Sequence, residues 1–201
     1  MKRKYEGVWI LFIAAAAALV GGCPNGDVLP IYEIGDTGPA GGLIFYVDEA
    51  NAFAWTYLEA APKNEEFTST EWADESGWLV GQDAQGTAIG DGEDNTEAIV
   101  TAYDNNPDVI DGYAAQVCYQ LTVTNNDETY NDWFLPSRDE LSAIYENLQD
   151  RTSPLGDFED YQYWSSSEED DYGAFYVYFG DGSTGSFTKL NEVCVRAVRS
   201  F

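Results

Sequence analysis

The sequence predicts an α+β domain, with short helices packed on a small twisted antiparallel sheet and connected by long loops. Three observations predict this class. A helix-start signal precedes an amphipathic stripe at 137–148, and short segments rich in aromatic and β-branched residues follow it. An alternating apolar segment at 43–47 adds a strand near the start of the domain. We expect the organising unit to be one helix feeding a Trp- and Tyr-rich antiparallel sheet.

Residues 1–22 have the pattern of a lipoprotein signal peptide. Basic residues at positions 2–4 precede an apolar run at 8–20, which is too short to span a bilayer comfortably. The run ends in Leu-Val-Gly-Gly-Cys, which resembles a bacterial lipobox with Cys23 as the lipidated residue. The alternative is an ordinary signal peptide with an incidental cysteine. We expect a protein lipid-anchored on the outer surface of the bacterial cell envelope, with a tether at 23–33 and one domain at 34–201.

The first half of the domain contains a hairpin, a long loop and two helices. Strands are expected at 43–47 and 53–60, with the turn at 48–51. Residues 62–94 are polar and Gly-rich, with Trp72 and Trp78 embedded, which is typical of a functional loop or an elaborate packed one. Asp94 or Asn95 is expected to cap a helix that runs to about Tyr103, and a second helix is expected at about 112–121.

The second half begins with the clearest local signal in the chain. Ser137 is the predicted N-cap and Glu140 its capping-box partner. Leu141, Ile144 and Leu148 then recur with helical spacing. Farther on, Gly-Asp-Gly-Ser at 180–183 and Thr-Gly-Ser at 184–186 are the turn residues expected of hairpins.

Charge and histidine content exclude several functions. The chain has 36 acidic and 9 basic residues, a formal net charge of −27, and no histidine. Such a field repels polyanions, so nucleic acid is excluded as a partner and sulfated glycans are disfavoured. The absence of histidine removes Ser-His-Asp and Cys-His catalysis and the commonest zinc ligand. Paired carboxylates for glycoside hydrolysis stay open, because acids are abundant.

Four ordered strings carry a family resemblance: GDTGPAGGLIFYVD, DWFLPSRDEL, YWSSSE and VRAVRSF. Together they look like the C-terminal domain of Legionella collagen-like proteins, a domain that is similar to the C-type-lectin and sulfatase-modifying-factor folds. The resemblance covers about residues 34–201 and implies a ligand-binding module displayed outside the cell. The Legionella proteins are associated with sulfated glycosaminoglycans, which the charge of this chain disfavours. The calcium-holding sugar motifs of C-type lectins, such as Glu-Pro-Asn and Trp-Asn-Asp, do not occur in this sequence.

The chain contains three cysteines. If Cys23 carries lipid, Cys118 and Cys194 remain as one pair in an oxidising compartment. A bridge between them would join a helix to the last strand, as the main disulfide of C-type-lectin-like folds does. The alternative is two buried free thiols.

The acidic segment 90–97 is a candidate calcium site. Asp91, Glu93 and Asn95 sit at i, i+2 and i+4, like the first ligands of a calcium loop. The sixth position is Thr96 rather than Gly, and the twelfth is Ala102 rather than Glu, so the segment is not an EF-hand. A helix-capping loop is the favoured alternative. No cofactor other than calcium is expected.

The candidate binding site is an aromatic and acidic face at 161–181. If Phe175, Val177 and Phe179 point into the core, Tyr176 and Tyr178 lie on the other face. Tyrosines mixed with short acids are typical of binding surfaces; the alternative is a second layer of core aromatics. The proposed ligand-binding residues are Tyr161, Tyr163, Glu168, Asp170, Asp171, Tyr172, Tyr176, Tyr178 and Asp181. Arg138, Arg196 and Arg199 are expected to pair with acids such as Asp139.

These observations favour a non-enzymatic binding module on a lipid anchor. Its partner would be an extracellular glycan or a protein of a host or neighbouring cell. The alternatives are an exported carbohydrate-active enzyme using paired carboxylates and a structural envelope lipoprotein.

Overall fold

The computed structural model describes residues 31–73, 79–104, 111–150, 152 and 154–201. Residues Tyr32–Phe201 form one compact unit. The predicted signal peptide, Cys23 and Trp78 lie outside the described residues. Within the described ranges, no helix is both long enough and apolar enough to cross a bilayer.

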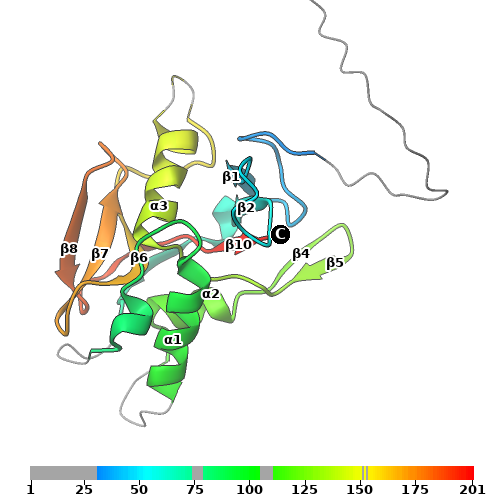
Figure 1. The fold of residues 1–201 in the computed structure, drawn as a ribbon. Coiled ribbons are helices and arrows are strands. Elements are labelled where there is room, and N and C mark those ends of the chain that lie inside the picture. The colour runs from blue at the N-terminus through cyan, green and yellow to red at the C-terminus, as the bar shows by residue number, and fades with distance from the viewer. Residues whose placement is uncertain (1–30, 74–78, 105–110, 151, 153) are drawn as a thin grey trace, which may run out of the picture. The chain divides into compact units, whose positions relative to one another are not determined.

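A three-stranded sheet joins the two ends of the unit. It has the order β1 (Leu43–Val47), β2 (Tyr57–Ala60) and β10 (Val198–Ser200), with both pairings antiparallel. The predicted hairpin is therefore confirmed, although its second strand starts at Tyr57 rather than at Phe53. The chain thus brings its last strand beside an early one (Figure 1).

A second sheet contains five strands in the order β3 (Phe67–Thr70), β9 (Val193–Val195), β6 (Gln162–Glu168), β7 (Gly173–Tyr178) and β8 (Thr184–Thr188). The predicted hairpin from β7 to β8 is confirmed. The expectation of a purely antiparallel sheet is wrong, because β9 runs parallel to β6. Local turn signals predict hairpins but carry no information about a strand that returns to the far side of the sheet.

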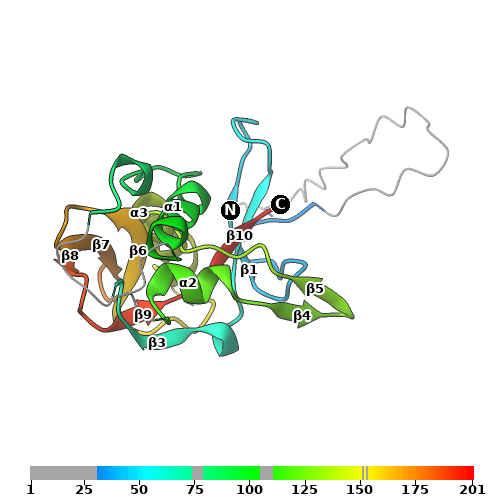
Figure 2. The same ribbon diagram turned by 90° about the horizontal axis from the view of Figure 1, so that it is seen from below.

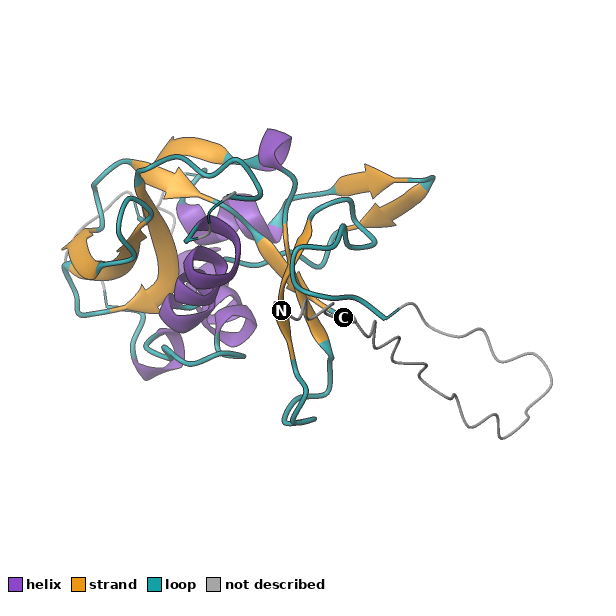
Figure 3. Ribbon diagram, turned by 90° about the horizontal axis from the view of Figure 1, so that it is seen from above, coloured by secondary structure: helices purple, strands orange, loops and turns teal. Residues whose placement is uncertain are grey.

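A third element, the hairpin of β4 (Val123–Asn125) and β5 (Glu128–Tyr130), projects from the body of the domain (Figure 3). This hairpin is not among the elements predicted from the sequence. Its turn is Asn126-Asp127, with both residues at positive φ, as a two-residue type I′ hairpin requires.

In the described ranges three α-helices pack on the two larger sheets: α1 (Gly92–Asp104), α2 (Ala114–Tyr119) and α3 (Arg138–Ile144), which continues as a π-helical turn at Tyr145–Gln149. Short 3₁₀ turns lie at Lys63–Glu65 and Gln82–Ala84. Both sides of the predicted capping box at Ser137 and Glu140 are present. The α+β class is therefore confirmed. Helix α1 starts two to three residues before the predicted caps.

The five-stranded sheet has apolar side chains buried on both faces. Trp164 and Val195 belong to a cluster with α1 and α2, whereas Tyr163 and Val177 belong to a second cluster with α3. Helices α1 and α2 lie together beside β6 (Figure 2). Trp72 is fully buried in the first cluster, and its indole N–H donates to the Ser165 carbonyl at 2.8 Å. The segment 62–94, predicted as one long loop, instead contains β3, both 3₁₀ turns and the start of α1 in its described part, and Trp72 anchors it in the core.

The N-termini of α1 and α3 meet at the buried Glu140 carboxylate. This group accepts hydrogen bonds from the backbone N–H of Ser137 and of Gly90, both at 2.8 Å. A Cβ at Gly92 would lie 2.2 Å from the same carboxylate, so only glycine fits there. This junction fixes where the first turn of α1 points.

Candidate functional site

A groove of about 420 Å³ lies where α1, the C-terminal end of α2 and the segment leading out of β5 come together. Its lining is mostly polar and acidic. The residues are Glu93, Thr96, Glu97, Tyr119, Gln120, Leu121, Thr122, Asn131, Asp132, Trp133 and Phe134. None of them is a serine, a cysteine or a histidine.

Hydrogen bonds hold two walls of the groove in place, α1 and the segment after β5. Thr96 on α1 accepts a hydrogen bond from the backbone N–H of Leu135 at 3.0 Å, which ties the helix to the segment after β5. The indole N–H of Trp133 donates to the Tyr130 carbonyl at 3.1 Å. These contacts leave Glu93, Glu97 and Tyr119 exposed at the mouth of the groove.

Asp132 connects the groove to an arginine beneath it. Arg199 donates to both carboxylate oxygens of Asp132, at 2.8 and 2.7 Å, and also reaches Glu59 at 3.3 Å. Its guanidinium lies 4.9 Å from the ring centroids of both Tyr130 and Phe201. The prediction that Arg199 pairs with acids is therefore confirmed, and this cation is already shared between two carboxylates.

Negative charge in the groove is under-compensated. Partial burial raises the pKa of Glu93, and the neighbouring charges of Glu97, Asp94 and Asp132 raise it further. Glu93 and Glu97 are one helical turn apart, so their carboxylates face the same side of α1. A ligand that supplies hydroxyl or ammonium donors would relieve this repulsion.

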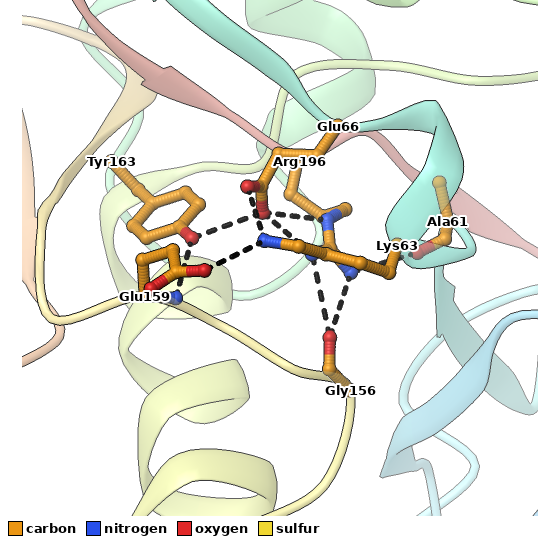
Figure 4. A network of polar contacts seen from close by, with 7 residues as sticks. All are labelled: Ala61, Lys63, Glu66, Gly156, Glu159, Tyr163 and Arg196. Atoms are coloured by element: carbon orange, nitrogen blue, oxygen red, sulfur yellow. Dashed lines mark hydrogen bonds and ion pairs between the residues drawn. The ribbon is translucent and has the colours of Figure 1, made fainter.

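The predicted aromatic and acidic face is not a single surface. Tyr163 is fully buried, and its hydroxyl donates to Glu66 at 2.9 Å and accepts from the Glu159 N–H at 3.1 Å (Figure 4). Its assignment to the binding site was wrong, because both faces of β6 pack against apolar clusters.

Glu168 was also wrongly assigned to the binding site. Its side chain and that of Lys189 are completely buried and form an ion pair at 2.6 Å. Glu168 further accepts from the N–H groups of Val80 and Gly81, both at 2.9 Å. This carboxylate therefore attaches the segment after the Trp72 loop to the sheet.

The remaining members of the predicted face are dispersed. Tyr161 and Tyr172 are exposed but lie beyond opposite ends of β6, a strand of seven residues and thus about 23 Å long. Tyr176 is half-buried and stacks on Phe187 at 4.3 Å, and Tyr178 is also half-buried. Asp170 and Asp181 accept backbone N–H groups in turns, and Asp171 is only partly exposed.

The candidate calcium ligands do not converge. Asp91 accepts from the Ala88 N–H at 2.8 Å, and the buried Asn95 amide both donates to and accepts from the Gly86 backbone. Of the three candidate ligands, only Glu93 lines the groove described above. Among the described residues, no group of three Asp, Glu, His or Cys side chains could hold a metal ion. Segment 90–97 forms the capped start of α1 instead.

The predicted disulfide is absent, and Cys118 and Cys194 are both buried free thiols. The reason is the alternation of side chains along β9. Val193 and Val195 face the cluster that contains Cys118, so Cys194 faces the opposite cluster. Burial raises the pKa of both thiols.

Sequence reasoning missed most of the groove. The signal that could have found it was the pair Glu93 and Glu97 on one exposed helix face, followed by Tyr119 on the polar side of α2. Asp132 and Trp133 were noted only as part of a family string. Their proximity depends on contacts across the fold, such as that of Thr96 with Leu135.

Comparison with known proteins gives a family and a similarity to solved structures. The family model of the Lcl C-terminal domain matches residues 47–199, which confirms the resemblance inferred from the sequence. No curated protein matches the sequence. A fimbrial protein from Bacteroides ovatus is similar in structure, with a TM-score of 0.46 and 15% sequence identity over 80% of this chain and 44% of that one. The chain therefore spans less than half the length of that structure.

Proposed function

We propose that this chain, which belongs to the Lcl C-terminal domain family, is a non-enzymatic ligand-binding module displayed on the bacterial cell envelope. Its binding site is the groove between α1 and α2. The ligand is a glycan or a protein segment that is neutral or positively charged. The observation that carries this proposal is the exposed Tyr119 beside the under-compensated carboxylates Glu93 and Glu97.

The groove offers two complementary kinds of contact. An exposed tyrosine ring supplies apolar area and a hydroxyl at low entropic cost. Carboxylates and the amides of Gln120 and Asn131 accept or donate hydrogen bonds to hydroxyl and amino groups. The net charge of −27 disfavours sulfated or phosphorylated ligands at the same place.

Truncation of the groove should weaken binding without unfolding the domain. Glycan and host-protein arrays probed with residues 23–201, with and without calcium, would supply the first ligand. Tyr119→Ala and Glu97→Gln should each weaken its binding by about 1–3 kcal/mol, because they remove exposed contacts of the proposed site. Calorimetric titration measures the loss, and a thermal melt should show little change in Tm.

Tyr172→Ala is the matched control, since Tyr172 is 58% exposed and Tyr119 is 49% exposed. If Tyr119→Ala still binds the ligand and Tyr172→Ala does not, the ligand binds at the face formed by residues 161–181 and not in the groove.

One observation favours the alternative of a carbohydrate-active enzyme. Partial burial raises the pKa of Glu93, and the neighbouring charge of Glu97 raises it further; a carboxyl group with a raised pKa is what the general acid of glycoside hydrolysis needs. An enzyme would release reducing ends from a polysaccharide and would lose that turnover in Glu93→Gln while keeping its affinity. The binding module releases none. A structural envelope lipoprotein would bind nothing on the arrays.

The lipid anchor at Cys23 is part of the proposal and rests on the lipobox-like sequence. Cys23→Ser should move the protein out of the membrane fraction and abolish labelling by radioactive palmitate, because the thioether is the site of attachment. Unchanged partitioning of this variant would rule the anchor out.

A C-type-lectin-like fold is also proposed. Its support is the packing of short helices on a small sheet that joins β1 and β10 through β2. An experimental structure that superposes on no C-type-lectin-like domain would refute it.

A further inference from the structure

The outer edge of β8 carries unused backbone hydrogen-bonding groups. β8 is an edge strand of the five-stranded sheet and, among the described residues, pairs only with β7 (Figure 1). Lys189 N–H donates to the Tyr172 carbonyl, and Tyr178 N–H donates to the Ser183 carbonyl. The direction of backbone hydrogen bonds alternates along an antiparallel pair. The N–H and C=O groups of Gly185 and Phe187 therefore point toward β7, whereas those of Thr184, Ser186 and Thr188 point away from the sheet.

The outward backbone groups of Thr184 and Ser186 are open in the described part of the chain, whereas the Thr188 carbonyl is already used. The Thr188 carbonyl accepts from the Asn191 N–H at 2.9 Å, which agrees with its outward direction. No described residue hydrogen-bonds to the backbone of Thr184 or Ser186 on that side. The side chains of all three outward residues are exposed.

β8 also lacks the features that usually protect an edge. Its register with β7 is regular over five residue pairs, whereas β1, β3 and β6 each show a register shift. The strand Thr-Gly-Ser-Phe-Thr contains no charge and no proline. Lysines, prolines and bulges are the common means of blocking strand addition, and none is present within β8.

We propose that β8 is a docking edge for an extended peptide segment of a partner protein, which adds to the sheet as a sixth strand. Exposed acids flank the edge at both ends: Asp181 precedes β8, and Asp170 accepts the Gly173 N–H at 2.8 Å beside the Gly173–Thr188 pair at the far end. Charge complementarity therefore selects a segment with an uncharged middle and basic ends. A second copy of this chain is disfavoured, because antiparallel pairing of two β8 strands would bring these acids together in proteins of net charge −27.

Alternate side chains of the added peptide would lie on opposite faces of the sheet and contact different β8 side chains. On one face, Phe187 stacks on Tyr176 with ring centroids 4.3 Å apart, and it offers an apolar flank. On the other face, Thr184, Ser186 and Thr188 form a polar row. The segment should therefore alternate apolar and hydroxyl side chains.

A synthetic peptide tests this directly. The probe is a capped seven-residue peptide of alternating threonine and valine with a lysine at each end. We expect saturable binding to the full chain by fluorescence anisotropy and slower amide exchange at Ser186. Ser186→Pro, which removes an outward N–H, should weaken binding about tenfold or more.

Two further variants keep the test decisive if Ser186→Pro fails to fold. Ser186→Lys places a blocking charge on the edge and should also weaken binding, whereas Gln82→Lys adds the same charge on an exposed 3₁₀ turn and should not. A peptide N-methylated on the amides that face the edge should not bind. Absence of binding by the unmodified peptide, or equal binding of its N-methylated form, would overturn the proposal. A dimer in sedimentation that Ser186→Lys abolishes would overturn it too, since it would make a second copy the occupant.

Discussion

Replacing Glu66 with alanine is expected to lower the free energy of unfolding by about 3–5 kcal/mol, because it leaves a buried guanidinium without its counter-charge. The Arg196 and Glu66 side chains are 1% and 3% exposed. Glu66 accepts from Arg196 at 3.1 and 2.5 Å, from Lys63 at 2.6 Å and from Tyr163 at 2.9 Å (Figure 4). One carboxylate thus joins β6, the residue that follows β9 and the 3₁₀ turn before β3. Urea unfolding monitored by tryptophan fluorescence measures the loss.

Lys63→Met is the matched control, because the Lys63 side chain is 35% exposed and should contribute less than about 1 kcal/mol. The double variant Glu66→Leu with Arg196→Met should be more stable than Glu66→Ala alone, since it removes both buried charges. Equal unfolding midpoints for Glu66→Ala and Lys63→Met would contradict this account of the network.

Glu140→Gln should change how stability depends on pH. Burial raises the pKa of Glu140 from 4.5 to about 7, although backbone N–H groups of Ser137, Gly90 and Gly92 oppose the shift. Between these values the folded protein keeps a proton that the unfolded chain has released. The free energy of unfolding therefore falls as the pH rises from about 4.5 to about 7, and this one group accounts for about 3 kcal/mol.

The side chain of the Glu140→Gln variant cannot titrate. Its free energy of unfolding should therefore not show this part of the decrease between about pH 4.5 and pH 7. Urea unfolding at pH 5 and pH 8 gives the difference for the original chain and for the variant. Glu146→Gln, at an exposed position after α3, is the control and should keep the original difference. If Glu140→Gln shows the same fall as the original chain, the assignment to Glu140 is wrong.

Local signals predicted much of the secondary structure. The capping box at Ser137, the hairpin of β1 with β2 and the turn between β7 and β8 each depend on a few adjacent residues. The order of strands in a sheet, in contrast, does not depend on adjacent residues. The parallel pairing of β6 with β9 joins Tyr163 to Cys194, and no single turn connects those strands, because β7 and β8 lie between them in the sequence.

The site was harder to predict than the fold. Alternation along β7 predicted one core face and one free face, but clusters on both faces of the sheet bury Tyr163 and half-bury Tyr176. Glu168 is a charged residue of a type that is rarely buried, and only its partner Lys189, 21 residues away, explains why it is. The groove likewise forms from α1, α2 and the segment after β5, which no local motif links.

The central claim is that ligands bind in the groove between α1 and α2. The most direct measurement is the footprint of the first array ligand, mapped by backbone amide chemical shifts of the isotopically labelled protein. The account predicts that the largest shifts fall at Glu93, Glu97 and Tyr119 and in 131–133, with Tyr161 and Tyr172 unchanged. Shifts confined to Tyr161, Tyr172 and the 169–172 turn would contradict it.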